Sequence, residues 1–346
     1  MSSKHAALVR LLRRSEQSIA EAVTEGFLAR HPDWVARYGD LARIRGVEDA
    51  RFHVQFLSGA IESDSPAAFA DYVRWTTRVL ESRGIDRAFL RENLLQVQDA
   101  AAALLSPPHV DVLTRFMAAA LDSGDVLEPP PVAPHALTTT RNMFVQTILK
   151  GDRKAALTVV TEALRDGASI QDLYADVFQD GLREVGRLWE TNAITVAQEH
   201  MATAVTQYVM AKVFDRIEPP ETARGTAVIT GVPGEFHHIG PMMIADMLEA
   251  NGWRVQFLGS NLPSPAIVAA IKDARPDVLG VSVTMLFNLH EAGRLIELVR
   301  GLGAPIRIVV GGAAFRVATD WRQTGADAYA ADLKAAVALL CSRLPA

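Results

Sequence analysis

The sequence predicts a protein of mixed α and α/β class, in which two helical parts precede a doubly wound parallel sheet. Three observations support this expectation. Helical periodicity fills the chain as far as residue 217, a proline-rich segment interrupts it near residue 130, and β-branched runs alternate with helix-length segments from residue 226 onward. A chain of 346 residues is also long enough for two or three domains rather than one core.

The first part, residues 1–124, is expected to be an all-helical domain of globin-like size. Its helical period is interrupted at four places that contain Pro, Ser or Gly, which predicts five or six helices, and no strand pattern appears. The segment 125–137 follows and includes the run DVLEPPPVAPH. Because proline blocks helix formation and favours extended backbone, we expect a semi-rigid linker there.

The second part, residues 138–218, is expected to form a four-helix bundle. Apolar residues recur at i, i+3 and i+4 between Ile170 and Trp189 over about five turns, which is typical of a helix packed in a bundle. Thr195 and Gln198 form a capping box, which predicts that another helix begins directly after Thr195.

The third part, residues 219–346, is expected to be a five-stranded, doubly wound parallel sheet of the flavodoxin or Rossmann type. The predicted strands are residues 226–230, 254–258, 277–284, 306–312 and 327–330. Helix-length segments separate these runs, as in repeated βα units. Because such sheets bind ligands beyond the carboxyl ends of their strands, we expect the site in the loops after the first four strands.

Composition excludes several classes of function. A net charge of -5 gives no electrostatic reason to expect nucleic-acid binding. The single cysteine, Cys341, excludes a disulfide framework or a cysteine-rich metal site within one chain. The N-terminus has no apolar signal-peptide core, and no apolar run reaches the roughly 18 residues of a membrane span. We therefore expect a cytoplasmic protein without membrane association.

The loop after the first predicted strand reads GVPGEFHHIGP and contains Glu235, His237 and Gly240. A neutral imidazole is a good transition-metal ligand, and a carboxylate bonded to its other nitrogen fixes the tautomer and raises its basicity. Glu235 and His237 are near enough in sequence for that arrangement. Taken alone, an acidic residue near a histidine in a loop is more often ordinary surface, so this motif leaves both interpretations open.

The third and fourth predicted strands end in Ser282-x-Thr284 and in Gly311-Gly312. Turn geometry explains such residues without any ligand. The functional alternative is that the hydroxyl groups bond a buried heteroaromatic nitrogen, while the glycines let a nucleotide tail lie against the backbone.

The order Glu-x-His-x-x-Gly, Ser-x-Thr and Gly-Gly across a five-stranded sheet, after a four-helix bundle, resembles the cobalamin-binding domain family over about residues 138–346. The resemblance implies that His237 is the lower axial ligand of cobalt and that Glu235 is its hydrogen-bonded partner. It further implies that Ser282 bonds the base of the cofactor's tail, whose slot is lined by Gly311 and Gly312.

The sequence departs from the commonest pattern of that family, which is Asp-x-His-x-x-Gly with Ser-x-Leu. Here Glu235 replaces the aspartate and Thr284 replaces the leucine. Both changes keep the chemistry and resemble the photoreceptor branch of the family more than its methyl carriers.

A second motif consists of Trp189, nine intervening residues, and then Glu199-His200. Trp189 lies on an apolar stripe, where a core tryptophan is expected, whereas an ionisable pair is an unusual core filler. The pattern is similar to that of CarH-type light sensors, which bind adenosylcobalamin. That resemblance implies that Trp189 covers the adenosyl group, that Glu199 contacts it, and that His200 takes the upper cobalt position after light.

The N-terminal block differs from CarH-type repressors, which begin with a helix-turn-helix module, so we do not expect nucleic-acid binding. His53 lies on an apolar stripe and is more often a core histidine than a ligand. The next predicted helix mixes aromatic residues with arginines that are able to hold a flat pigment and its propionates or simply to pack. These residues are Tyr72, Arg74, Trp75 and Arg78.

The whole arrangement resembles the photocobilins, which pair adenosylcobalamin with biliverdin. Any bilin is expected to be noncovalent, because Cys341 lies in the sheet domain. The resemblance predicts a signalling photoreceptor rather than an enzyme, acting through light-dependent homo-oligomer assembly or a separate effector protein. The alternative is a corrinoid methyl carrier of a methyltransferase system, which needs His237 but not the upper residues. A mutase subunit is disfavoured because the chain contains no substrate barrel.

Overall fold

The computed structural model describes residues 4–122, 134–218, 220, 223–317 and 320–342. Most of the predicted linker, residues 125–133, lies outside the described residues. The chain forms two compact units. The helical unit contains the N-terminal helices together with Thr284–Arg294 and Ala313–Thr324, and the bundle–sheet unit contains the other described segments.

The N-terminal part of the helical unit is all-helical, as expected. Its helices within residues 4–122 are α1 (Ala6–Arg14), α2 (Glu16–Arg30), α3 (Pro32–Tyr38), α4 (Asp40–Glu62), α5 (Pro66–Glu81), α6 (Arg87–Ala102) and α7 (Pro107–Leu121). These seven helices exceed the five or six predicted, because Ser15 and Gly39 also end helices. Gly39 has a φ of +57°, a backbone conformation that glycine adopts without steric strain.

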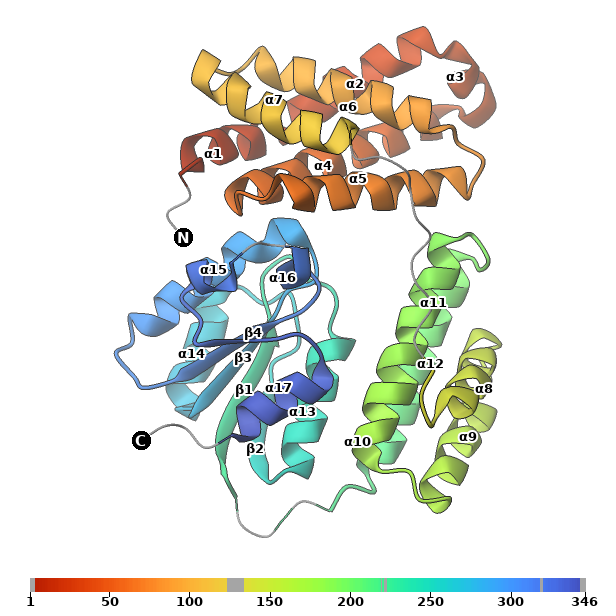
Figure 1. Ribbon diagram of the computed structural model, residues 1–346, viewed down its shortest axis with the longest axis vertical. Helices are drawn as coiled ribbons and strands as arrows, with labels where there is room; N and C mark the ends of the chain where they lie inside the picture. Colours follow the sequence, from red (N-terminus) through yellow and green to blue (C-terminus); the bar gives the residue numbers. More distant parts are fainter. Residues whose placement is uncertain (1–3, 123–133, 219, 221–222, 318–319, 343–346) are drawn as a thin grey trace. The chain divides into compact units, whose positions relative to one another are not determined.

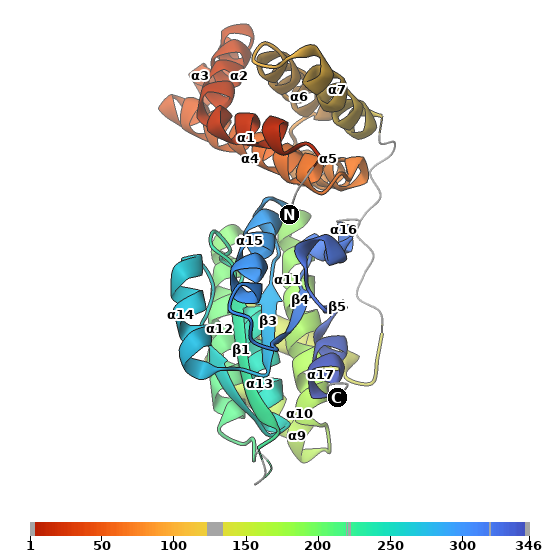
Figure 2. The ribbon, with the colours of Figure 1, turned by 90° about the vertical axis from the view of Figure 1, so that its left-hand side faces the viewer.

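Helix α4 is central to the helical unit. It contacts each of the other six helices between residues 4 and 122 (Figures 1 and 2). Its buried side chains include Val54, Leu57 and Ile61. A proline at the first position of α5 and of α7 begins both helices, where its missing N–H has no hydrogen bond to lose.

The bundle–sheet unit begins with the predicted four-helix bundle. Its elements are α8 (Thr138–Leu149), α9 (Arg153–Arg165), α10 (Ile170–Asp172), η1 (Leu173–Gln179), α11 (Asp180–Glu190) and α12 (Val196–Phe214). Elements α10, η1 and α11 together form the third bundle helix, whose middle part is π-helical. The capping box of Thr195 and Gln198 is present at the start of α12, which confirms that prediction.

The sheet is parallel and doubly wound, as predicted. Its strands are β1 (Gly225–Gly231), β2 (Trp253–Phe257), β3 (Val278–Ser282), β4 (Arg307–Gly311) and β5 (Ala328–Ala330), in the order β2-β1-β3-β4-β5. The strand order reverses at β1, so the loops after β1 and β3 lie at the switch point where such folds bind ligands. The third strand ends at Ser282, two residues earlier than predicted.

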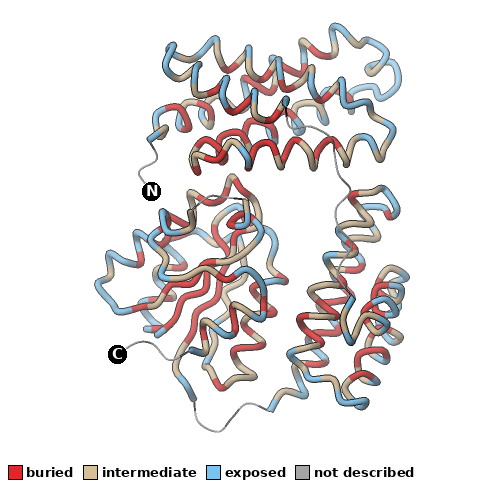
Figure 3. The backbone as a smooth tube through the Cα atoms, in the orientation of Figure 1, coloured by how far each residue is buried: buried red, intermediate tan, exposed pale blue. Residues whose placement is uncertain are grey.

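Helices cover both faces of this sheet. They are α13 (Ile239–Ala250), α14 (Ser264–Ala274), α15 (Leu289–Arg300) and α17 (Leu333–Cys341), with short connecting turns η2 (Leu286–Asn288), α16 (Ala314–Val317) and η3 (Trp321–Thr324). Helices α13 and α17 pack together on one face, while α14 lies on the opposite face (Figure 2). The central strands are buried along their length (Figure 3).

The bundle packs directly on helices α13 and α17. Buried residues of the bundle such as Phe178 share one apolar core with Met243 of α13 and Leu333 of α17. Tyr174 Oη donates a hydrogen bond of 2.8 Å to Asp246 Oδ2 across this contact. Bundle and sheet therefore form one packed body. No helix of the described segments combines the length and apolar character that a membrane span requires.

Candidate functional site

The loop between β1 and α13, residues 232–238, is called the His loop. Glu235 is fully buried, and its Oε1 accepts hydrogen bonds from the backbone N–H of His237 at 3.1 Å and from His237 Nδ1 at 2.5 Å. An ionised carboxylate can only accept, so Nδ1 carries the proton and Nε2 keeps its lone pair. The His237 side chain is 56% exposed. The loop thus presents one oriented imidazole, held as metal-ligating histidines are held.

Ser260 and Asn261, which follow β2, hold the His loop in place. Ser260 Oγ donates to the backbone oxygen of His237 at 3.3 Å, and Asn261 Oδ1 accepts from the backbone N–H of Gly234 at 2.9 Å. The sequence reasoning missed both residues. The available signal was the sheet topology, because β2 pairs with β1 in parallel and their carboxyl ends share one edge.

The glycines of the His loop region serve different purposes. A Cβ on Gly231 would lie 2.4 Å from Ser260 Oγ, so protein packing itself requires this glycine. A Cβ on Gly240 would meet no atom within 4 Å, and Gly240 is exposed in the first turn of α13. Gly240 is therefore not explained by packing inside the protein, and it leaves free surface beside His237.

A narrow cavity of about 30 Å³ lies between the sheet and helices α13 and α17. Gly280, Ser282 and Gly311 line it from the strands, and apolar side chains of α13 and α17 line its other wall. Ser282 and Gly311 are therefore brought together in the wall of one cavity. We call this cavity the tail slot.

Gly312 and Thr284 do not line the tail slot. Gly312 has a φ of +105°, and a Cβ there would lie 2.2 Å from the backbone oxygen of Val283. The close approach of the chain segments that follow β3 and β4 therefore accounts for Gly312. Thr284 lies beyond the end of β3 and belongs to the helical unit.

A second imidazole stands in the first turns of α12. His200 Nδ1 lies 2.7 Å from Glu199 Oε2 and 3.0 Å from the backbone oxygen of Val196. Because a carbonyl oxygen only accepts, Nδ1 donates, and Nε2 is left with its lone pair. The His200 side chain is 76% exposed. Trp189, at the end of α11, is partly buried against the bundle core.

A hydrogen bond connects α12 with the His loop. Gln207 Nε2 donates to His238 Nε2 at 2.5 Å, and His238 directly follows His237. Gln207 lies seven residues after His200, which is two helical turns and about 10 Å along the same face of α12. The helix face that carries His200 is therefore joined to the loop that carries His237. The sequence reasoning missed Gln207 and His238, although the i, i+7 spacing from His200 was a usable signal.

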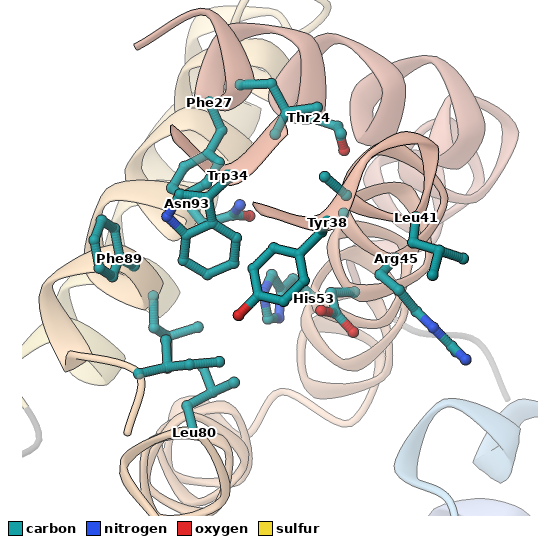
Figure 4. A pocket seen from close by; sticks show the side chains of 16 residues that line it. Thr24, Phe27, Trp34, Tyr38, Leu41, Arg45, His53, Leu80, Phe89 and Asn93 are labelled. Carbon is teal, nitrogen blue, oxygen red and sulfur yellow. The ribbon is translucent and has the colours of Figure 1, made fainter. Parts of the chain in front are cut away.

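The helical unit contains a larger cavity of about 400 Å³ (Figure 4). Its walls are mainly aromatic and aliphatic, including Phe27, Trp34, Tyr38, Leu41, Leu80 and Phe89. His53 lines this cavity, and its Nδ1 forms a hydrogen bond of 2.7 Å with Tyr72 Oη. Burial lowers the pKa of His53 to about 4, so this imidazole is neutral, and burial also raises the pKa of Tyr72.

The other residues predicted to hold a bilin are placed differently. Tyr72 contacts His53 but is absent from the cavity wall. Arg74 forms an ion pair with Asp71 and lines a separate cavity of about 270 Å³. Trp75 and Arg78 line neither cavity. Of the predicted set, His53 alone lies in the wall of the larger cavity.

Comparison with known proteins gives consistent matches for the bundle and the sheet. Two family models, each described as a B12 binding domain, match residues 140–213 and 225–338. The transcriptional repressor CarA of Myxococcus xanthus is 30% identical over 197 residues, which are 55% of this chain and 63% of CarA. The chain therefore spans less than two thirds of that relative.

Corrinoid proteins of methanogens are similar over a larger share of their own length. Dimethylamine corrinoid protein 3 of Methanosarcina acetivorans is 31% identical over 162 residues, which are 46% of this chain and 75% of that protein. The structure of the monomethylamine corrinoid protein of Methanosarcina barkeri superposes with a TM-score of 0.52 and 21% identity, covering 59% of this chain and 98% of that one. This last likeness establishes a shared fold.

Proposed function

Because the chain belongs to the family of B12-binding proteins, its cofactor is a corrinoid, and we propose that the protein is a light sensor that binds adenosylcobalamin. The observation that carries the proposal is the presence of two exposed imidazoles in the bundle–sheet unit. In both, the Nδ1 nitrogen lies beside a carboxylate, Glu235 for His237 and Glu199 for His200. One imidazole suffices for a lower cobalt ligand, so the second needs a separate role.

The residues below the corrin fit the cofactor. His237 would hold cobalt through Nε2, and Gly240 leaves surface against which a large planar group can lie. The tail slot has an apolar wall and the hydroxyl of Ser282, which suits an aromatic base with one hydrogen-bonding nitrogen. At about 30 Å³ the slot is narrow.

The residues proposed to lie above the corrin belong to α11 and α12. Trp189 would cover the adenosyl group, Glu199 would contact it, and His200 would supply a ligand to cobalt after light. When bound, adenosylcobalamin supplies a Co–C bond that visible light breaks. Gln207 and His238 keep the His200 face of α12 beside the His loop, so a change at His200 is transmitted to the packing of bundle on sheet.

The corrinoid methyl carriers supply the second candidate function. The observation in its favour is that the chain covers 75% of dimethylamine corrinoid protein 3, compared with 63% of CarA. A methyl carrier needs the lower imidazole and an upper face open to its methyltransferase. It has no use for an upper Trp, Glu and His set, which is why we favour the light sensor.

The helical unit is proposed to carry biliverdin as a second pigment in its cavity of about 400 Å³. The apolar walls and the neutral His53 suit a flat pigment, which is noncovalent because the one cysteine, Cys341, lies in α17. The protein acts as a signalling module rather than an enzyme. Its output is a change in self-association or in contact with a separate effector protein.

One experiment tests the proposal directly. The protein is loaded with adenosylcobalamin in the dark and illuminated while its absorbance spectrum is followed, for the wild type, His200→Ala, His237→Ala and a control variant, His109→Ala, in the helical unit. We expect loss of the adenosyl group in light and a bis-histidine spectrum for the wild type and the control, but no bis-histidine spectrum for His200→Ala. Identical dark and lit spectra of the wild type would refute the light-sensor function. Methyl transfer from methylcobalamin with a partner methyltransferase would establish the methyl-carrier function instead.

A further inference from the structure

The large cavity of the helical unit contains polar groups that contacts within the protein do not explain. Asn93, on α6, lines the cavity, and its Oδ1 is buried without a hydrogen-bond partner among the described residues. A buried acceptor that lacks a donor is costly, so native proteins rarely leave one unpaired. Asn93 Oδ1 therefore indicates that a donor enters this cavity from outside the chain.

Asp49, on α4, offers a second acceptor in the same wall, and it is an exposed residue. No hydrogen bond or ion pair reaches its carboxylate from the described part of the chain. Arg45 also lines the cavity, but it is paired with Glu48 at 2.8 Å, and its side chain extends away from the other labelled residues in Figure 4. Desolvation and then repulsion from Glu48 raise the pKa of Asp49 to about 6, against a lowering effect of Arg45.

The rest of the wall is apolar and presents aromatic rings. Phe27, Trp34 and Phe89 form a mutual edge-to-face cluster with ring centroids 5.4 to 5.9 Å apart. Tyr38 lies beside Trp34, with ring centroids 5.7 Å apart. Aromatic walls of this kind favour a flat ligand, through stacking and through attraction between ring faces and a cation.

We propose that this cavity selects a flat heteroaromatic ligand that presents N–H donors and positive charge, and that Asp49 and Asn93 are its polar anchors. The inference rests on the proposed function in one respect, since biliverdin is the pigment assigned to this cavity. Its pyrrole N–H groups are the donors concerned, and they carry positive charge once the tetrapyrrole is protonated. Asp49 supplies the counter-charge, Asn93 Oδ1 accepts one N–H, and the aromatic cluster contacts the ring plane.

The test uses two fluorescent probes of opposite charge. Proflavine is flat, cationic and carries amino donors, whereas 8-anilinonaphthalene-1-sulfonate is an anion. Both are titrated into the wild type, Asp49→Asn, Asn93→Leu and a charge-matched control, Asp40→Asn, which changes a residue of the same helix that does not line the cavity. We expect Asp49→Asn to weaken proflavine binding about tenfold or more while the sulfonate binds as well as before or more tightly. Asn93→Leu weakens proflavine binding alone, and Asp40→Asn changes neither affinity.

The inference is overturned if Asp49→Asn does not weaken proflavine binding selectively. Unchanged proflavine affinity in Asp49→Asn would show that Asp49 is not an anchor. An equal loss of affinity for both probes would show that Asp49 has only a structural role. Biliverdin titration of the same variants separates the inference from the proposed function. If proflavine binding depends on Asp49 but the wild type does not bind biliverdin, the inference is supported and biliverdin is ruled out as the pigment. If biliverdin binds and neither substitution affects its affinity, biliverdin remains the pigment, but Asp49 and Asn93 are not its anchors.

Discussion

Glu235 Oε1 lies 2.5 Å from His237 Nδ1, and the carboxylate is fully buried whereas the imidazole is more than half exposed. We expect Glu235→Gln to keep the loop folded, because the amide oxygen still accepts both hydrogen bonds. The imidazole loses the negative charge that raises its basicity, so cobalamin binding weakens by about ten- to a hundredfold. Spectroscopic titration with cobalamin measures this loss.

The matched control for Glu235→Gln is Glu297→Gln, which makes the same chemical change at an exposed position of α15. It is expected to leave cobalamin affinity unchanged. Equal affinity of Glu235→Gln and the wild type would contradict a role of Glu235 in cobalt ligation. A parallel urea unfolding curve shows whether any lost affinity comes from lost folding instead.

Gly240 and Gly312 are expected to respond in opposite ways to alanine. A Cβ on Gly240 meets no protein atom, so Gly240→Ala leaves the free energy of unfolding unchanged or raises it by up to about 1 kcal/mol. Cobalamin affinity falls in the same variant, because the new methyl group occupies surface assigned to the corrin. Thermal unfolding without cofactor and titration with cobalamin separate the two effects.

Gly312→Ala provides the contrasting measurement. Its Cβ would lie 2.2 Å from the oxygen of Val283 on a backbone with a φ of +105°. The free energy of unfolding is therefore expected to fall by about 1 to 3 kcal/mol or more, with or without cobalamin. A stable Gly312→Ala protein that only fails to bind cobalamin would mean that Gly312 serves the ligand rather than the fold.

The features that sequence predicts well are those encoded over short distances. The three central strands, β1, β3 and β4, were found because each is a mostly buried run rich in β-branched residues and bounded by turn residues. The Glu235–His237 pair was found because the partners are two residues apart and their chemistry matches a known motif. The capping box at Thr195 was found for the same reason.

The features that sequence reasoning missed depend on packing between distant segments. Gln207 meets His238 only because the bundle packs on α13, and Ser260 reaches the His loop only because β2 pairs with β1. Asp49 and Asn93 read as ordinary polar positions of helices until α4 and α6 enclose a cavity. Arg74 was assigned to a pigment, although an aspartate three residues earlier already pairs with it.

The burial of Asp246 predicts a pH dependence of stability. Burial, with a smaller contribution from Glu249, raises the pKa of Asp246 to about 6 from an ordinary value of 3.8. Because the folded state binds this proton more tightly than the unfolded state, the stabilisation is complete below about pH 4 and is lost as pH rises through about 6. Asp246→Asn removes this loss, which we expect to be about 1 to 2 kcal/mol for a partly exposed group.

Urea unfolding at pH 4.5, 5.5 and 7 measures the effect as the difference between the wild type and Asp246→Asn. The difference is needed because Asp49 also has a raised pKa and contributes with the same sign. Tyr174→Phe is the informative partner variant. The hydrogen bond from Tyr174 lowers the pKa of Asp246, so its removal enlarges the pH dependence. A difference that stays constant over this pH range would refute the assignment.

Gly59 allows α4 to approach the segment after β3 within the helical unit. A Cβ on Gly59 would lie 2.9 Å from Phe287 Cα and 3.0 Å from the backbone oxygen of Leu286. Beside it the ring of Phe56 meets Phe287 edge-on, with centroids 5.2 Å apart, and stacks on Tyr72 at 3.9 Å. Gly59→Ala forces these backbones apart, so the free energy of unfolding is expected to fall by about 1 to 3 kcal/mol.

This loss is expected even though alanine favours helix over glycine by about 1 kcal/mol. The control is Gly26→Ala on α2, where a Cβ meets only the mobile ends of Gln96 and Arg30 and the helix preference therefore dominates. Urea unfolding of both variants should show Gly26→Ala at least as stable as the wild type and Gly59→Ala less stable. If Gly59→Ala were instead the more stable of the two, α4 would not depend on a close backbone contact with Leu286 and Phe287.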